Sequence, residues 1–308
     1  HPRREHDPLD PAGILMFEQL VEAVEQAERD GLSLGELALR SEAADGLRSR
    51  EEVEATLQRA LDVMRQAIAR GLPGDLRSVS GLVGGDAARV ANGKGPLAGT
   101  VFTASLAAAL AVQEVNAAMG VIVAAPTAGG AGVLPGVLLG LSQLRPVSDA
   151  ALIRALAAAG LVGAVVAVRA SLSGAEGGCQ AETGAAAGMA AAAGVDLLGG
   201  SPVEAAHACA LTMQGTLGLV CDPLGGLVEV PCVYRNATGA AMALAGIEMA
   251  LAGVRFPIPV DEVIDTMGEI GRTMDVRYRE TAGGGLAATP TGRKLARERL
   301  VQLKGKNQ

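Results

Sequence analysis

Aromatic residues are almost missing from this sequence of 308 residues: it has no tryptophan, two tyrosines and three phenylalanines. The core must therefore be built from aliphatic side chains, and 49% of the residues are hydrophobic. Only 19% are charged and the net charge is −7, which excludes nucleic acid as the main partner because such surfaces need clustered basic residues. The same apolar, weakly charged composition excludes intrinsic disorder. We expect a folded globular protein.

Charge is concentrated at the two ends of the chain. Residues 1–94 carry 29 charged side chains and residues 261–308 carry 16, whereas residues 95–260 carry 14. Residues 115–144 lack charge entirely over a length that would cross a bilayer. Pro126, Pro135 and a glycine loop interrupt this stretch, and its flanks lack a basic-rich loop and an aromatic belt, so we expect two buried helices and no membrane span. The polar N-terminus shows no signal peptide, which favours a soluble, cytoplasmic protein.

Hydrophobic residues recur with the helical period through most of the chain, which predicts an all-α fold. Alanine and glycine at helical spacing indicate helices in close contact. We expect amphipathic N-terminal helices over residues 1–77, a core over 78–292 and a polar tail over 293–308, all in one structural domain. The best strand candidate is the short run Gly120–Ala124. Helices are predicted over residues 15–29, 50–70, 98–118, 134–144, 149–169, 181–194, 202–217, 237–253 and 260–273.

Glycine-rich loops separate several of these helices. None of them has the pattern of a phosphate-binding P-loop or of a dinucleotide fingerprint. Such loops either end helices or present backbone N–H groups that bind an anion such as a carboxylate. They comprise residues 125–132, 173–179, 222–226 and 281–292.

All four cysteines lie in the apolar centre of the chain. Cys209 stands among alanines in a predicted helix, where we interpret it as a small buried hydrophobic residue. Cys179, Cys221 and Cys232 each have glycine or proline nearby in predicted loops. Their spacing does not match the short knuckles of zinc sites. Three thiolates that converge would fit a 4Fe–4S cluster with one iron left open, but spacing alone also permits a site without metal.

At these residues the sequence resembles the iron–sulfur-dependent L-serine dehydratases, in particular their catalytic α chain. The resemblance runs in family order over about residues 78–292. The segments that carry it are SGLVGGD (80–86), EVNAAMG (114–120), AAPTAGGAGVLP (124–135), GAEGGCQAE (174–182), GLVCDP (218–223), GLVEVPC (226–232), RN (235–236), ET (280–281) and GLAATPTG (285–292).

The resemblance implies that Cys179, Cys221 and Cys232 bind a 4Fe–4S cluster that converts L-serine to pyruvate and ammonia. It implies an all-helical catalytic domain, a separate β chain as partner, and an oligomeric protein. Some relatives carry a further cysteine near the C-terminus that occupies the open iron. Here no cysteine follows Cys232, so we expect an open, oxygen-labile cluster.

Two loops are candidates for binding the carboxylate of the substrate. We place this role on the backbone of Thr127, Ala128 and Gly129, together with Ser80 and Gly81. In each loop, N–H groups free of helical bonding would face the anion.

Three residues are candidates for catalytic roles. Glu176, three residues before Cys179, is a candidate general base, an aid to positioning Cys179, or a helix cap. Asn236 either binds the carboxylate or caps a helix. Lys94 either meets the carboxylate or is a solvated loop residue. His207, in a predicted helix near Cys209, is interpreted as a packed or surface residue.

Other function classes are weighed against the same residues. Pyridoxal phosphate chemistry needs a Schiff-base lysine, and three of the four lysines lie in the polar tail, so we expect no such cofactor. The nearest rival is an L-cysteine desulfidase with the same cluster. A non-catalytic iron–sulfur protein would lack an open iron, and a zinc module would need Cys209 as its fourth ligand.

Overall fold

The computed structural model of the chain describes residues 17–44 and 47–305, with side chains as far as residue 299. In this part of the chain the only β contact is an isolated parallel bridge between Cys221 and Arg279, so the predicted all-α fold is confirmed. The helices are α1 (Leu20–Asp30), α2 (Leu34–Ala44), α3 (Arg50–Gly71), α4 (Asp86–Ala91), α5 (Val101–Ala117), η2 (Ala128–Gly130), α6 (Val133–Leu141), α7 (Asp149–Arg169), α8 (Gly174–Gly177), η3 (Gln180–Gly184), α9 (Ala185–Leu198), α10 (Pro202–Met213), η4 (Gln214–Thr216), η5 (Leu224–Gly226), α11 (Cys232–Leu251), α12 (Val260–Thr273), η6 (Val276–Tyr278), η7 (Gly285–Ala288) and α13 (Pro290–Gly305).

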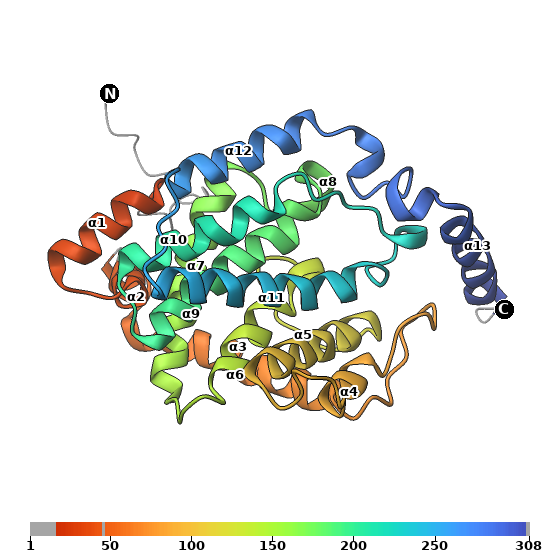
Figure 1. Cartoon of the computed structure of the whole chain (residues 1–308), viewed down its shortest axis with the longest axis horizontal. Coiled ribbons are helices and arrows are strands. Elements are labelled where there is room, and N and C mark those ends of the chain that lie inside the picture. Colours follow the sequence, from red (N-terminus) through yellow and green to blue (C-terminus); the bar gives the residue numbers. More distant parts are fainter. Residues whose placement is uncertain (1–16, 45–46, 306–308) are drawn as a thin grey trace.

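Helix α9 forms the centre of the molecule. Helices α6, α7, α10 and α11 pack around it, and α5 packs against α6 and α11 (Figure 1). Every residue of α9 except Leu198 is buried, and most of them are alanine or glycine. A Cβ on Gly188 would lie only 2.6 Å from Met213 Cγ on α10, so glycine allows these two helices to approach. The excess of small residues thus builds a core of closely packed helices.

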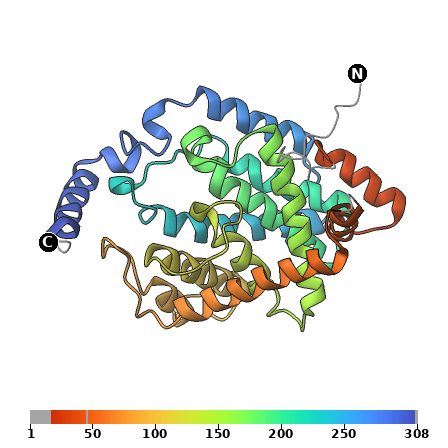
Figure 2. The same cartoon turned by 180° about the vertical axis from the view of Figure 1, so that it is seen from behind.

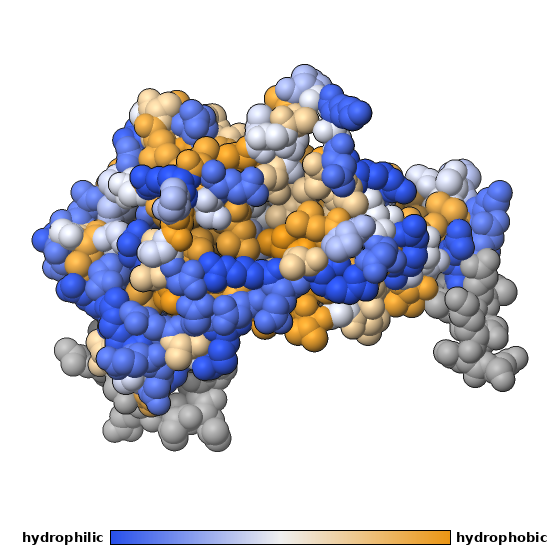
Figure 3. All heavy atoms as spheres, turned by 90° about the horizontal axis from the view of Figure 1, so that it is seen from below, coloured by the Kyte–Doolittle hydropathy of each residue, from blue (hydrophilic) through white to orange (hydrophobic). Residues whose placement is uncertain are grey.

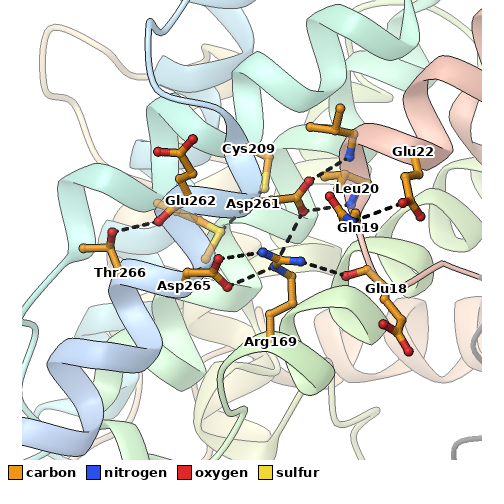
Figure 4. Close-up of polar contacts among 12 residues, drawn as sticks. Glu18, Gln19, Leu20, Glu22, Arg169, Cys209, Asp261, Glu262, Asp265 and Thr266 are labelled. Atoms are coloured by element: carbon orange, nitrogen blue, oxygen red, sulfur yellow. Dashed lines mark hydrogen bonds and ion pairs between the residues drawn. The ribbon is translucent and has the colours of Figure 1, made fainter. Parts of the chain in front are cut away.

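The N-terminal helices cover this core from outside. Helix α3 crosses the lower part of the view in Figure 2 and packs against α5. Asp261 of α12 accepts the first two backbone N–H groups of α1, at 2.8 and 3.0 Å (Figure 4). Arg169 at the end of α7 pairs with Asp265 at 2.6 Å and donates to the Glu18 carbonyl oxygen. These contacts fasten α1 to both α7 and α12.

Most predicted helices are confirmed. Helices α3, α7 and α12 match their predicted ranges to within a residue, and α5, α6, α9 and α10 occupy the predicted segments with shifted ends. The helix predicted from residue 237 begins at Cys232, which places this cysteine on a helix and not in a loop. The first predicted helix begins at Leu20, and residues 15 and 16 of that prediction lie outside the described residues.

One prediction of local structure is wrong, and four helices are missing from the prediction. The strand predicted over Gly120–Ala124 is wrong, because this segment forms a loop with no neighbouring strand in the described chain. Helices α2, α4, α8 and α13 were not predicted, and α13 occupies most of the expected polar tail. The division of the chain at residues 77 and 292 stays a prediction.

The long uncharged stretch forms the end of α5, a loop and α6, as predicted. Helix α7 is long and apolar enough to cross a membrane by length and composition, and 61% of its most apolar window is buried inside the protein. On the face shown in Figure 3, hydrophobic side chains gather toward the middle, among hydrophilic ones. Large hydrophobic residues exposed on the described surface include Met119 and Val121.

Candidate active site

Three of the four cysteines come together from separate segments. Cys179 lies between α8 and the π-helical turn η3. Cys221 lies in the segment between η4 and η5, and Cys232 is the first residue of α11. All three are buried and none is in a disulfide. Burial is the main cause that raises the pKa of Cys221, and the thiols of Cys179 and Cys232 raise it further. The three thiols therefore lie within electrostatic reach of one another.

Arg235 brings a positive charge to these thiols. Its Nη2 lies 2.7 Å from Asp222 Oδ1, and its Nη1 donates to the Val220 carbonyl oxygen at 2.8 Å. Burial would lower the pKa of Arg235, but the adjacent Cys179 thiol and Asp222 carboxylate outweigh it and raise the pKa. A fixed guanidinium stabilises thiolate over thiol, which is the form that binds metal.

Glu182 is the carboxylate that stands beside the cysteines. Its Oε2 lies 3.9 Å from Cys221 Sγ, and its Oε1 accepts a hydrogen bond of 2.8 Å from the Thr127 hydroxyl. A Cβ on Gly174 would meet both this carboxylate and the Cys221 sulfur, and a Cβ on Gly129 would lie 2.9 Å from the carboxylate. Burial is the main cause that raises the pKa of Glu182. Gly129 and Gly174, in two separate loops, thus leave room for the buried Glu182 side chain.

Asn236 holds the loop that carries Thr127. Its Oδ1 accepts from the Gly132 N–H at 2.9 Å and from Gln113 Nε2 at 3.2 Å. Its Nδ2 donates to the carbonyl oxygens of Gly129 and Cys232, at 2.6 and 2.9 Å. All its hydrogen-bonding capacity is used within the protein. Asn236 therefore fastens this loop to the Cys232 end of α11 and has no group left for a substrate carboxylate.

The predicted carboxylate-binding loop keeps two free donors. The carbonyl oxygen of Ala128 accepts hydrogen bonds from Gln113 and Asn116. Within the described chain, the backbone N–H groups of Ala128 and Gly129 donate no hydrogen bond. These are the first N–H groups of η2, where a helical turn leaves donors without partners.

Ser80 is tied to the segment that precedes Cys232. Its backbone N–H donates to Glu229 Oε1 at 2.9 Å, and its hydroxyl donates to Glu229 Oε2. Both donors of Ser80 are thereby engaged, and the neighbouring Gly81 donates its N–H to the Ser78 carbonyl oxygen. In this structure Ser80 and Gly81 position the Cys232 segment and present no free donor to a ligand.

Within the described chain, the other predicted residues make no hydrogen bond to the three thiols, although Glu176 lines the same cavity as Glu182. Glu176 is exposed on α8, where it accepts a hydrogen bond of 2.6 Å from the Ser171 hydroxyl. Lys94 lies in an exposed loop between α4 and α5. His207 accepts a hydrogen bond from the Phe256 N–H, in line with the packed or surface role expected for it. Cys209 is fully buried in α10 beside Met213, and burial raises its pKa to about 12.

Sequence reasoning missed Glu182, Glu229 and the role of Arg235. A signal was available, because residues 95–260 hold only 14 charged side chains and these three are among them. A charge inside a very apolar segment needs a partner in the fold. Glu182 accepts from Thr127 and Glu229 accepts from Ser80, whereas Arg235 pairs with Asp222 next to Cys221.

Comparisons with known proteins agree with one another. The family described as "Serine dehydratase alpha chain" matches residues 29–287. "Probable L-serine dehydratase, alpha chain" of Bacillus subtilis (strain 168) is 46% identical and covers 92% of this chain and 95% of the relative. "L-serine dehydratase, alpha chain" of Peptoniphilus asaccharolyticus is 38% identical and covers 91% and 97%. "L-serine dehydratase TdcG" of Escherichia coli (strain K12) is 41% identical and covers 88% of this chain but 61% of the relative.

Proposed function

We propose that this chain, which belongs to the serine dehydratase alpha chain family, converts L-serine to pyruvate and ammonia with an iron–sulfur cluster held by Cys179, Cys221 and Cys232. Loss of water from serine leaves an enamine, which becomes an imine and hydrolyses to the two products. One observation carries the proposal: three buried cysteines from distant segments gather beside Arg235 and Glu182.

The donor set suits a cluster better than a single ion. Within the described residues no three His, Cys, Asp or Glu side chains close around one point, as a mononuclear site would require. In a 4Fe–4S cluster each thiolate binds its own iron, so the sulfurs stay apart. Soft thiolates select such clusters. With three protein thiolates, the fourth iron would supply Lewis-acid chemistry to the substrate hydroxyl, otherwise a poor leaving group.

The chain's own residues bind and orient the amino acid. A cavity of about 420 Å³, which is ample space for serine, lies against Thr127, Gly174 and three glutamates, Glu176, Glu182 and Glu280. The free N–H groups of η2 bind the substrate carboxylate. Glu182, held by the Thr127 hydroxyl, faces the ammonium group. Burial of this carboxylate strengthens its attraction for a cation, because the local dielectric constant is low.

The test is anaerobic reconstitution with iron and sulfide, followed by a pyruvate assay with L-serine. The chain should produce pyruvate, and Cys221→Ser should abolish it. Cys209→Ala is the matched control, because Cys209 is a buried cysteine of the helical core, and this variant should retain activity. Sulfide release from L-cysteine at a higher kcat/KM than serine turnover would replace the proposal with a desulfidase. No turnover of either amino acid in a fully loaded sample, alone or with a β chain, would refute it.

We also propose that a separate β chain completes the enzyme and that the assembly is oligomeric. The chain matches 61% of the length of the Escherichia coli relative, so that relative carries further sequence. Met119 and Val121 are 81% and 77% exposed, which suits a surface covered by another chain. A β chain should bind in size-exclusion chromatography with light scattering and raise pyruvate production, and Met119→Ser should weaken this binding. A full-length β chain that neither binds nor raises activity would count against it.

A cytoplasmic location is part of the same proposal. Its support is that none of the four cysteines forms a disulfide in the structure, as is usual for proteins of reducing compartments. Fractionation of cells that produce the chain should recover it with a cytoplasmic marker, and recovery with a membrane or secreted marker would contradict this.

A further inference from the structure

A second cavity lies between α8 and α12 and adjoins the proposed substrate cavity, with which it shares Ala170, Ser171 and Glu176. Its volume is about 420 Å³, and Ser171, Glu176, Gly177, Arg272 and Arg279 are among the residues that line it. Helices α8 and α12 meet at one edge, where a Cβ on Gly271 would lie 2.8 Å from Gly177 Cα. The cavity therefore has walls from two helices and from the segment after η6.

The charge on these walls is unbalanced. Arg279 Nε is shielded from water and has no hydrogen-bond partner among the described residues. Arg272 adds a second guanidinium, which lies close to Gly268 on its own helix. The carboxylate on these walls is that of Glu176, and it already accepts a hydrogen bond of 2.6 Å from the Ser171 hydroxyl. No ion pair to Arg279 is formed within the described chain.

A shielded guanidinium with an unused donor is costly unless an acceptor occupies the neighbouring space. Arg279 Nε is the shielded donor and the Arg272 guanidinium is exposed to solvent, and an anion between them would satisfy the donor and balance both charges. Arginine presents a planar fork of N–H groups, which matches the two oxygens of a carboxylate. The cavity has ample space for a small carboxylic acid.

We propose that this cavity binds a small carboxylate, with Arg279 and Arg272 as the binding residues. Its walls include neither the η2 donors nor the cysteines, and they border the proposed substrate cavity at Ser171 and Glu176. Only the identity of the ligand, an amino acid or a keto acid, rests on the proposed function. Binding would also act on the active site, because the backbone beside Arg279 pairs with Cys221: the Cys221 N–H donates to the Tyr278 carbonyl oxygen at 2.8 Å and its carbonyl oxygen accepts from Glu280 at 2.9 Å.

The experiment is isothermal titration of the reconstituted full-length chain in chloride buffer. Sodium pyruvate tests the keto acid, L-alanine tests an amino acid that lacks the leaving hydroxyl, and inorganic phosphate tests a general anion. We expect saturable binding of pyruvate or L-alanine. Arg279→Gln should weaken it at least about tenfold, because a charge-assisted hydrogen bond is lost. Arg59→Gln, at an exposed arginine of α3, is the matched control and should bind as the wild type does.

If circular dichroism shows that Arg279→Gln does not fold, the same titration is carried out with Arg272→Gln. Absence of saturable binding, binding of phosphate alone, or equal binding by wild type and both arginine variants would overturn the proposal. Its failure is distinguishable from failure of the proposed function. Pyruvate production from serine is assayed separately, and either result can be positive while the other is negative.

Discussion

Replacement of Asn236 by alanine should destabilise the protein far more than loss of one ordinary side chain. The Asn236 side chain is fully buried and makes four hydrogen bonds between 2.6 and 3.2 Å. Alanine fills less space and offers no polar atom. The Gly132 N–H and the Gly129 carbonyl oxygen would then remain buried without this partner, while Gln113 keeps its bond to Ala128.

The magnitude follows from counting the groups left unpaired. A buried polar group without a partner costs about 1–3 kcal/mol. Two such groups, with the small cavity added, give a loss of roughly 3–5 kcal/mol in the free energy of unfolding. For a domain of this size that corresponds to a melting temperature lower by roughly 10 °C. Aspartate should not rescue the loss, because it would set a carboxylate oxygen against two carbonyl oxygens.

Urea unfolding followed by circular dichroism measures this loss. The matched control is Asn92→Ala, because Asn92 is exposed and its side chain donates one hydrogen bond, to the Ala88 carbonyl oxygen. We expect the control to cost less than about 1 kcal/mol. If Asn236→Ala unfolds within about 1 kcal/mol of the wild type, Asn236 does not hold the η2 loop as argued here.

Three further predictions concern single carboxylates. Asp261→Ala removes the acceptor of two N–H groups of α1 and should cost about 2 kcal/mol in urea unfolding; a loss below about 0.5 kcal/mol would contradict the cap. The Arg50 hydrogen bond lowers the pKa of Glu36 from 4.5 to about 2, so its stabilisation is full above pH 4.5 and is lost toward pH 2. Glu36→Gln should therefore cost about 1 kcal/mol at pH 6 after solvent screening, and thermal melts should show this difference shrink, not grow, on acidification. Glu182→Gln keeps an acceptor for the Thr127 hydroxyl but removes a buried charge, so unfolding should change by less than about 1 kcal/mol while KM for serine rises at least about tenfold; an unchanged KM would exclude contact with the ammonium group.

Local patterns were enough to predict much of the helical fold. Ser49 and Glu52 form a complete capping box at the start of α3, and the amphipathic pattern of α12 fixes its ends. The predicted strand at residues 120–124 failed for a physical reason. Its β-branched residues favour a strand only when a neighbouring strand supplies packing and hydrogen bonds, and none lies beside it in the described chain.

The site was predictable only in part. The cysteines stand out by type and setting, but their neighbours are set by long-range contacts, such as the pairing of Ser80 with Glu229 across 149 residues. Glu176 and Glu182 lie equally near Cys179 in the sequence. The π-helical turn η3 directs Glu182 toward Cys221, whereas Glu176 lies on the exposed part of α8. Side-chain direction of this kind depends on the folded backbone and not on spacing.

Iron and acid-labile sulfide per chain after anaerobic reconstitution give the most direct test of the cluster assignment. The wild type and Cys209→Ala should each hold about four of both, while Cys179→Ser, Cys221→Ser and Cys232→Ser should each hold far less. One tightly bound metal ion per chain without sulfide, or full iron content in all three serine variants, would contradict the account.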